Sequence, residues 1–109
     1  MKIRWSEDAA DDLAQIIGFI AERSGKKMAR EVYYRIRERV VSVKEFPAAG
    51  RVVPELSAIG ISDIHELIEP PWRVFYRAHQ SELRVLSVID GRRNAEEILY
   101  RKVISGKIR

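Results

Sequence analysis

The sequence contains no cysteine and only two histidines, His65 and His79, among its 109 residues. Without cysteine, neither a disulfide framework nor a thiolate metal site can form. Because the two histidines lie far apart in the chain, we expect no metal site, and nothing in the sequence points to a cofactor. The first four residues are followed by acidic residues, so no secretory signal is apparent. The apolar runs are far shorter than the ~20 residues that span a bilayer, and we expect a cytoplasmic protein without membrane attachment.

The common catalytic motifs are also missing. The sequence has no glycine-rich phosphate loop, no H-E-x-x-H pair and no G-x-S-x-G turn. His65-Glu66 stands alone, and its two side chains would point to opposite faces of a strand. The standard machinery of hydrolases and transferases is therefore absent.

Positive charge is abundant and unevenly distributed. Charged residues make up 33% of the chain and the net charge is +4. Residues 92–109 contain six basic residues against two acidic ones, so this segment carries the whole excess and the first 91 residues are neutral. An acidic partner would meet the C-terminal segment first. The alternative is a solvated basic terminus that serves solubility.

The spacing of apolar residues predicts a helical hairpin near the N-terminus. Residues 2–5 read as a short strand, and Ser6 is a good N-cap for a helix that ends at Ser24-Gly25. A second helix is predicted from about residue 26 to residue 45, where Phe46-Pro47 ends it. Each predicted helix has an apolar face, and only the short Ser24-Gly25 link separates the two helices. We therefore expect them to pack antiparallel.

From about residue 62 onward, the spacing of the apolar residues changes from the 3.6-residue period of helices to the two-residue period of strands. Residues 62–69, 72–78 and 83–89 read as three strands joined by tight connections, and Asn94 can cap a final helix to about residue 103. The order β-α-α-β-β-β-α predicts an α+β fold with an antiparallel helical hairpin packed on one face of a small, mainly antiparallel four-stranded sheet. At this length we expect a single domain over residues 1–109.

The strand at residues 72–78 gives the candidate binding surface. Trp72, Val74 and Tyr76 would face the helical hairpin, and the opposite face would be left uncovered. Guanidinium groups bind carboxylates or phosphates, and flat rings stack on bases. The exposed surface would bind RNA or an acidic protein segment, or it would only be solvated. Its predicted residues are His65, Arg73, Phe75, Arg77 and Arg84 on the sheet, Arg51 before it, Arg92 and Arg93 after it, and Arg101 and Lys102 in the final helix.

Four segments together resemble the RelE/ParE superfamily of bacterial toxins. They are WSEDAADDLAQIIGFIAERS (residues 5–24), FPAAGRVVPEL (46–56), IHELIEPPWRVFYR (64–77) and LRVLSVIDGRR (83–93). The resemblance covers nearly the whole chain and implies the toxin of a type II toxin–antitoxin system. It also implies a cognate antitoxin that wraps an acidic, amphipathic segment around the toxin.

The superfamily has two branches with different targets. The helical hairpin and the GRVVPEL loop resemble the ParE branch, which implies inhibition of DNA gyrase. The RelE branch cuts mRNA on the ribosome, and its site here would use His65, Arg73, Arg77, Arg93 and Tyr100. Where many relatives have His-Gly-Arg-Arg, this chain has Asp90-Gly91-Arg92-Arg93, which removes a possible general acid. His65 replaces an arginine of many relatives and could restore a base. A non-toxic nucleic-acid-binding domain is the third reading.

Overall fold

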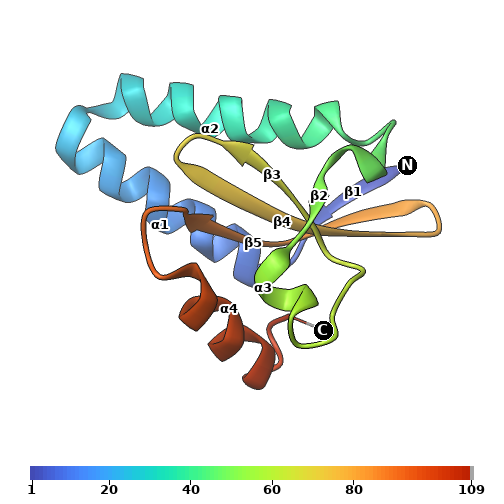
Figure 1. Ribbon diagram of the computed structural model, residues 1–109. Coiled ribbons are helices and arrows are strands. Elements are labelled where there is room, and N and C mark those ends of the chain that lie inside the picture. Colours follow the sequence, from blue (N-terminus) through green and yellow to red (C-terminus); the bar gives the residue numbers. More distant parts are fainter. Residues whose placement is uncertain (109) are drawn as a thin grey trace.

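The computed structural model describes residues 1–108. Along the chain, its elements are β1 (Lys2–Trp5), α1 (Glu7–Ser24), α2 (Lys26–Ser42), the 3-10 helix η1 (Pro47–Ala49), β2 (Arg51–Val52), α3 (Pro54–Ser57), β3 (His65–Glu69), β4 (Trp72–His79), β5 (Glu82–Asp90) and α4 (Ala95–Ile104). The predicted order is confirmed, and the two long helices form the predicted hairpin (Figure 1). Within residues 1–108, no helix is both long enough and apolar enough to cross a bilayer.

Local signals set the ends of the helices. The Ser6 hydroxyl accepts a hydrogen bond from the Ala9 amide at 3.1 Å, which caps α1. Gly25 has φ of 91° and separates α1 from α2, while its amide donates to the Ala21 carbonyl at 3.1 Å. The Asn94 side chain accepts from the Glu97 amide at 3.2 Å and caps α4. The helix after residue 26 ends at Ser42, three residues earlier than expected.

The sheet has five strands in the order β1-β5-β4-β3-β2, so the prediction of four strands is corrected. The strand pair β1–β5 is parallel, and the other pairs are antiparallel. The additional strand, β2, has only two residues, Arg51 and Val52, which pair with Glu66 and His65. A strand this short shows no alternation in the sequence, and its segment was expected to be a loop.

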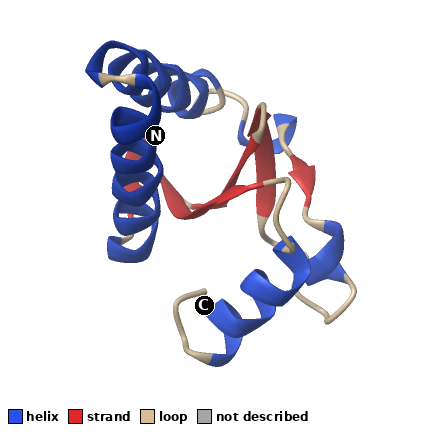
Figure 2. Ribbon diagram, turned by 90° about the vertical axis from the view of Figure 1, so that its left-hand side faces the viewer, coloured by secondary structure: helices blue, strands red, loops and turns tan. Residues whose placement is uncertain are grey.

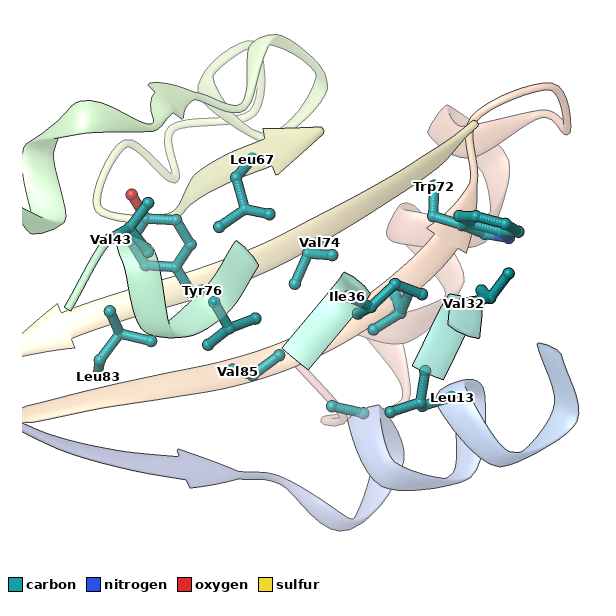
Figure 3. Close-up of a cluster of buried hydrophobic side chains, with 13 residues drawn as sticks. Leu13, Val32, Ile36, Val43, Leu67, Trp72, Val74, Tyr76, Leu83 and Val85 are labelled. Carbon is teal, nitrogen blue, oxygen red and sulfur yellow. The ribbon is translucent and has the colours of Figure 1, made fainter. Parts of the chain in front are cut away.

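One face of the sheet carries the larger core, against which α1 and α2 pack. As expected, Trp72, Val74 and Tyr76 point to this face. Figure 3 shows these side chains beside Val32 and Ile36 of α2 and Val85 of β5. We call this side of the sheet the hairpin face.

The opposite face, which we call the second face, is largely covered. A second core lies there, and Figure 2 shows the C-terminal helix on the side of the sheet away from the hairpin. Its buried members are Val53, Leu56, Ile64, Phe75, Leu86, Ile89, Ala95, Leu99 and Ile108. The expectation that this face lies open is therefore wrong, because α3, the loop after it and α4 bury its apolar centre.

Candidate functional site

Arg73 and Phe75 lie on the second face, but they do not form an exposed surface. Phe75 is fully buried in the second core, and the Arg73 guanidinium carbon lies 5.2 Å from the centre of its ring. The Arg73 side chain is only 12% exposed. The prediction of Phe75 as an exposed stacking residue is therefore corrected, because the segment around α3 closes over it.

Arg73 is neutralised by two carboxylates of the same chain. It donates to Glu55 at 2.7 and 2.9 Å and to Glu66 at 2.8 and 2.6 Å. The Glu66 side chain is fully buried and also lies 3.4 Å from Arg51. Hydrogen bonds from Arg73 lower the pKa of Glu55 from 4.5 to about 2. Both edges of the guanidinium group are thus occupied by carboxylates, and Arg73 links α3 to the sheet instead of facing a ligand.

His65 lies on the wrong face for the predicted basic surface. The β3–β4 register pairs His65 with Tyr76, whose ring faces the hairpin, and the two rings stack with centres 5.9 Å apart. Residues directly opposite each other in a ladder share a face. The Tyr76 hydroxyl donates to the Pro47 carbonyl at 2.5 Å and accepts from the Gly50 amide at 3.1 Å. The nuclease set is therefore divided: His65 lies on the hairpin face, and Arg73 and Arg77 lie on the second face.

The basic residues of α4 also have partners within the chain. Lys102 is 12% exposed, and its ammonium group donates to Asp8 and to both carboxylate oxygens of Asp12, at 3.1 and 2.9 Å. Asp12 in turn accepts hydrogen bonds from the Ser87 hydroxyl at 2.7 Å and from the Val88 amide at 3.0 Å. Lys102 thus fastens α4 to α1 and to the edge of β5, which is a structural role.

Two further predicted residues of α4 differ in exposure. Arg101 is 78% exposed and pairs with Glu97 one turn earlier at 2.7 Å. The Tyr100 hydroxyl is partly buried and donates to the Glu55 carbonyl at 3.4 Å. Tyr100 therefore packs beside the Arg73 network.

The loop after β5 leaves its arginines in solvent. The Arg92 side chain is 73% exposed and contacts Asp90 at 2.7 Å, and this hydrogen bond lowers the pKa of Asp90. Arg93 is exposed. Both arginines border a cleft of about 410 Å³ between α1, α4 and the sheet, which we call the Phe19 cleft. Its apolar lining includes Ile16, Phe19, Ile20, Trp72 and Ile98, and Phe19 is 58% exposed.

The open part of the second face lies toward the turn between β4 and β5. Arg77 is 24% exposed and contacts Asp63 at 2.7 Å, and Arg84 lies directly opposite it on β5. Arg84 is exposed. Both arginines line a pocket of about 550 Å³, whose charged lining also includes Lys107 and three acidic residues of α1, Glu7, Asp8 and Asp11. Of the predicted sheet residues, the structure therefore brings Arg77 and Arg84 together and leaves them accessible.

Several residues that determine the accessibility of these arginines and lysines were not predicted from the sequence. Glu55 and Glu66 form ion pairs that give Arg73 a structural role, and Asp8 and Asp12 do the same for Lys102. Arg4 is brought beside Arg84 by the parallel pairing of β1 with β5. Phe19 gave a signal in the sequence, since it departs from the apolar stripe of α1. The distant pairings of the acidic residues gave none.

Comparisons with known proteins agree with this architecture. A family described as the ParE toxin of type II toxin–antitoxin system, parDE, matches residues 3–95. Toxin ParE3 of Caulobacter vibrioides is 28% identical to this chain over 91 residues, which cover 84% of this chain and 87% of that protein. A chain of the chromosomal ParDE TA system from P. aeruginosa has the same fold, with a TM-score of 0.69 at 22% identity, covering 83% of this chain and 95% of that one. With the family match extending over most of the sequence, this chain belongs to the ParE toxins of type II toxin–antitoxin systems.

Proposed function

We propose that this protein is a toxin that inhibits DNA gyrase and that a cognate antitoxin protein neutralises it. The observation that carries the proposal is the family match over residues 3–95. The solved relative is described as a ParDE system, which supports a protein antitoxin as the partner. The single-domain organisation predicted for residues 1–109 fits a toxin that acts through its surface.

The surface chemistry supports a protein target more than an RNA substrate. Cleavage of RNA without a metal needs a base, an acid and cations around one phosphate. His65 lies on the opposite face of the sheet from Arg73 and Arg77, and Arg73 is held by two carboxylates. The Phe19 cleft, by contrast, combines an exposed ring with arginines at its border, as protein-binding surfaces often do.

The predicted residues that are exposed or partly exposed remain the proposed contacts for the antitoxin or the target. This group consists of Arg51, Arg77, Arg84, Arg92, Arg93 and Arg101. Arg73, Phe75 and Lys102 stay in the proposal only if a partner displaces the segments that cover them. A basic helix at the C-terminus is the element that such a partner would displace.

The proposal is tested by adding the purified protein to a supercoiling reaction with gyrase. We expect supercoiling to stop and translated mRNA to remain uncut in primer extension. Relaxation of the same DNA by topoisomerase I should be unaffected, which controls for simple DNA binding. Normal supercoiling at micromolar protein would overturn the gyrase assignment, and cuts in the ribosomal A site would favour the nuclease reading.

A matched pair of variants sharpens this test. Phe19→Ser changes the Phe19 cleft, and Phe46→Ser changes a phenylalanine that is 73% exposed after α2. If gyrase contacts the cleft, inhibition should fall with Phe19→Ser and persist with Phe46→Ser. If both variants inhibit gyrase as strongly as the wild-type protein, the cleft is excluded as the gyrase contact.

A further inference from the structure

Three arginines form a row across the second face of the sheet. The β1–β5 register places Arg4 beside Arg84, and the β4–β5 register places Arg84 opposite Arg77. The arginines point to the other face, because their sequence neighbours pack on the hairpin side: Leu83, Val85 and Tyr76 belong to the hairpin core, and Ile3 and Trp5 pack against it. We call these three residues the arginine row. It lies toward the β4–β5 turn, which projects at the right of Figure 1 beyond α4.

This arrangement is unfavourable for the free protein. In the antiparallel pair β4–β5, directly opposite side chains such as Arg77 and Arg84 have Cβ atoms about 4.5–5.5 Å apart, and like charges at this distance repel each other. Within residues 1–108, the Arg84 side chain makes no ion pair and no hydrogen bond that would offset the repulsion. A central, unpaired guanidinium with a charged neighbour on each side is the local arrangement that an added anion would stabilise.

The two ends of the row already bind carboxylates. Arg77 donates to Asp63 at 2.7 Å, and Arg4 lies 3.5 Å from Glu82. Asp63 is 64% exposed and belongs to the loop before β3, so its pair with Arg77 is open to solvent. The chain thus supplies a carboxylate at each end and leaves the middle position vacant. A carboxylate is therefore the group that matches the row.

The pocket around Arg84 favours a protein segment over a nucleic acid. Its charged lining consists of Arg77, Arg84 and Lys107 together with Glu7, Asp8 and Asp11 of α1. A nucleic acid carries a negative charge at every phosphate and would meet these acidic side chains. A peptide can place carboxylates on the arginine row and neutral or basic groups beside α1. Leu86 adds an apolar contact in the same pocket.

We propose that Arg4, Arg84 and Arg77 form the docking site for a carboxylate-bearing segment of a protein partner, with Arg84 as its central contact. Under the proposed function this partner is the antitoxin, and to that extent the inference rests on it. Binding of a carboxylate offsets the repulsion within the row, so the free energy of this repulsion is released on association. The Arg73 network takes no part, because Arg73 is only 12% exposed and is held by two carboxylates beneath α3.

The test measures the affinity of the antitoxin encoded by the neighbouring reading frame for three forms of the toxin. Arg84→Gln removes the central charge of the row, and Arg30→Gln removes an exposed charge from α2 as the matched control. We expect Arg84→Gln to weaken binding about tenfold and Arg30→Gln to leave it unchanged. Circular dichroism confirms that each variant is folded.

A second arm uses probes that do not depend on the antitoxin. Fluorescence anisotropy compares poly-L-glutamate with an oligodeoxynucleotide of equal length. We expect poly-L-glutamate to bind wild-type protein more tightly than the oligonucleotide does, and to lose affinity with Arg84→Gln alone. Tighter binding of the oligonucleotide, with the same dependence on Arg84, would overturn the assignment to a protein partner.

The two proposals fail in different ways. If the neighbouring protein does not bind the wild-type toxin, the antitoxin pairing is wrong, and the poly-L-glutamate arm decides the arginine row by itself. If the neighbouring protein binds but Arg84→Gln and Arg30→Gln have equal affinities, the arginine row is not the docking site. In that case the proposed function stands.

Discussion

The two ends of the second face use the same residue type in opposite ways. At one end Arg73 is 12% exposed and is held by two carboxylates, while at the other end Arg84 is exposed and unpaired within residues 1–108. Both residues lie in the antiparallel pair β4–β5. The difference is set by the covering segments, because α3 brings Glu55 to Arg73, whereas within residues 1–108 no carboxylate pairs with Arg84. An arginine on a sheet is therefore assigned to structure or to binding by what packs above it.

Burial also changes how much each ion pair contributes to the stability of the fold. Water screens an exposed ion pair, so it contributes little to stability. A buried pair is strongly coupled, and removal of one partner leaves a charge that has lost its hydration. The comparison between Arg73 and the arginine row therefore predicts very different responses to substitution.

The largest effect is expected when Arg73 is removed. Arg73→Met leaves the fully buried Glu66 with only the 3.4 Å contact to Arg51. We expect the free energy of unfolding in urea to fall by about 3–5 kcal/mol. Arg77→Met on the same strand is the control, because its partner Asp63 is 64% exposed and its loss should cost at most about 1 kcal/mol. Similar losses of unfolding free energy in both variants would mean that Arg73 and Arg77 contribute equally to stability and that the two ends of the second face do not differ.

The pH dependence of stability isolates one partner of Arg73. Glu55 has a pKa of about 2 in the folded protein against an ordinary value of 4.5. The unfolded chain therefore takes up this proton first as the pH falls, and the folded state loses stability between about pH 4.5 and pH 2. This contribution is at most about 3 kcal/mol above that window, because water screens the partly exposed carboxylate. Acid titrations of unfolding should show a shallower loss for Glu55→Gln, and an unchanged slope would contradict the coupling.

Local sequence patterns predicted the parts of the fold that depend on neighbouring residues. Ser6 and Asn94 cap helices through their side chains and Gly25 separates two helices, as predicted, and the alternation of Trp72, Val74 and Tyr76 gives the hairpin face. The cover of the second face could not be predicted in this way. It depends on α4 packing on Phe75 from more than twenty residues away and on Glu55 reaching Arg73.

The side of the sheet to which His65 points could have been predicted from the Pro70-Pro71 turn, but it was predicted wrongly. The two-residue connection Pro70-Pro71 pairs Glu69 with Trp72, and this register continues to His65 and Tyr76. The same reasoning on Gln80-Ser81 pairs Arg77 with Arg84. The position of Arg4 follows only from the parallel pairing of β1 with β5, strands that lie far apart in the sequence.

The smallest effect on stability, and the one of opposite sign, is expected at the arginine row. Arg84→Gln removes repulsion from Arg4 and Arg77 without breaking an ion pair. The free energy of unfolding should therefore rise by a few tenths of a kcal/mol, and the gain should shrink at high salt because salt screens exposed charges. Arg30→Gln should change nothing. A loss above about 1 kcal/mol with Arg84→Gln would show that Arg84 supports the fold, and the contrast with Arg73 would disappear.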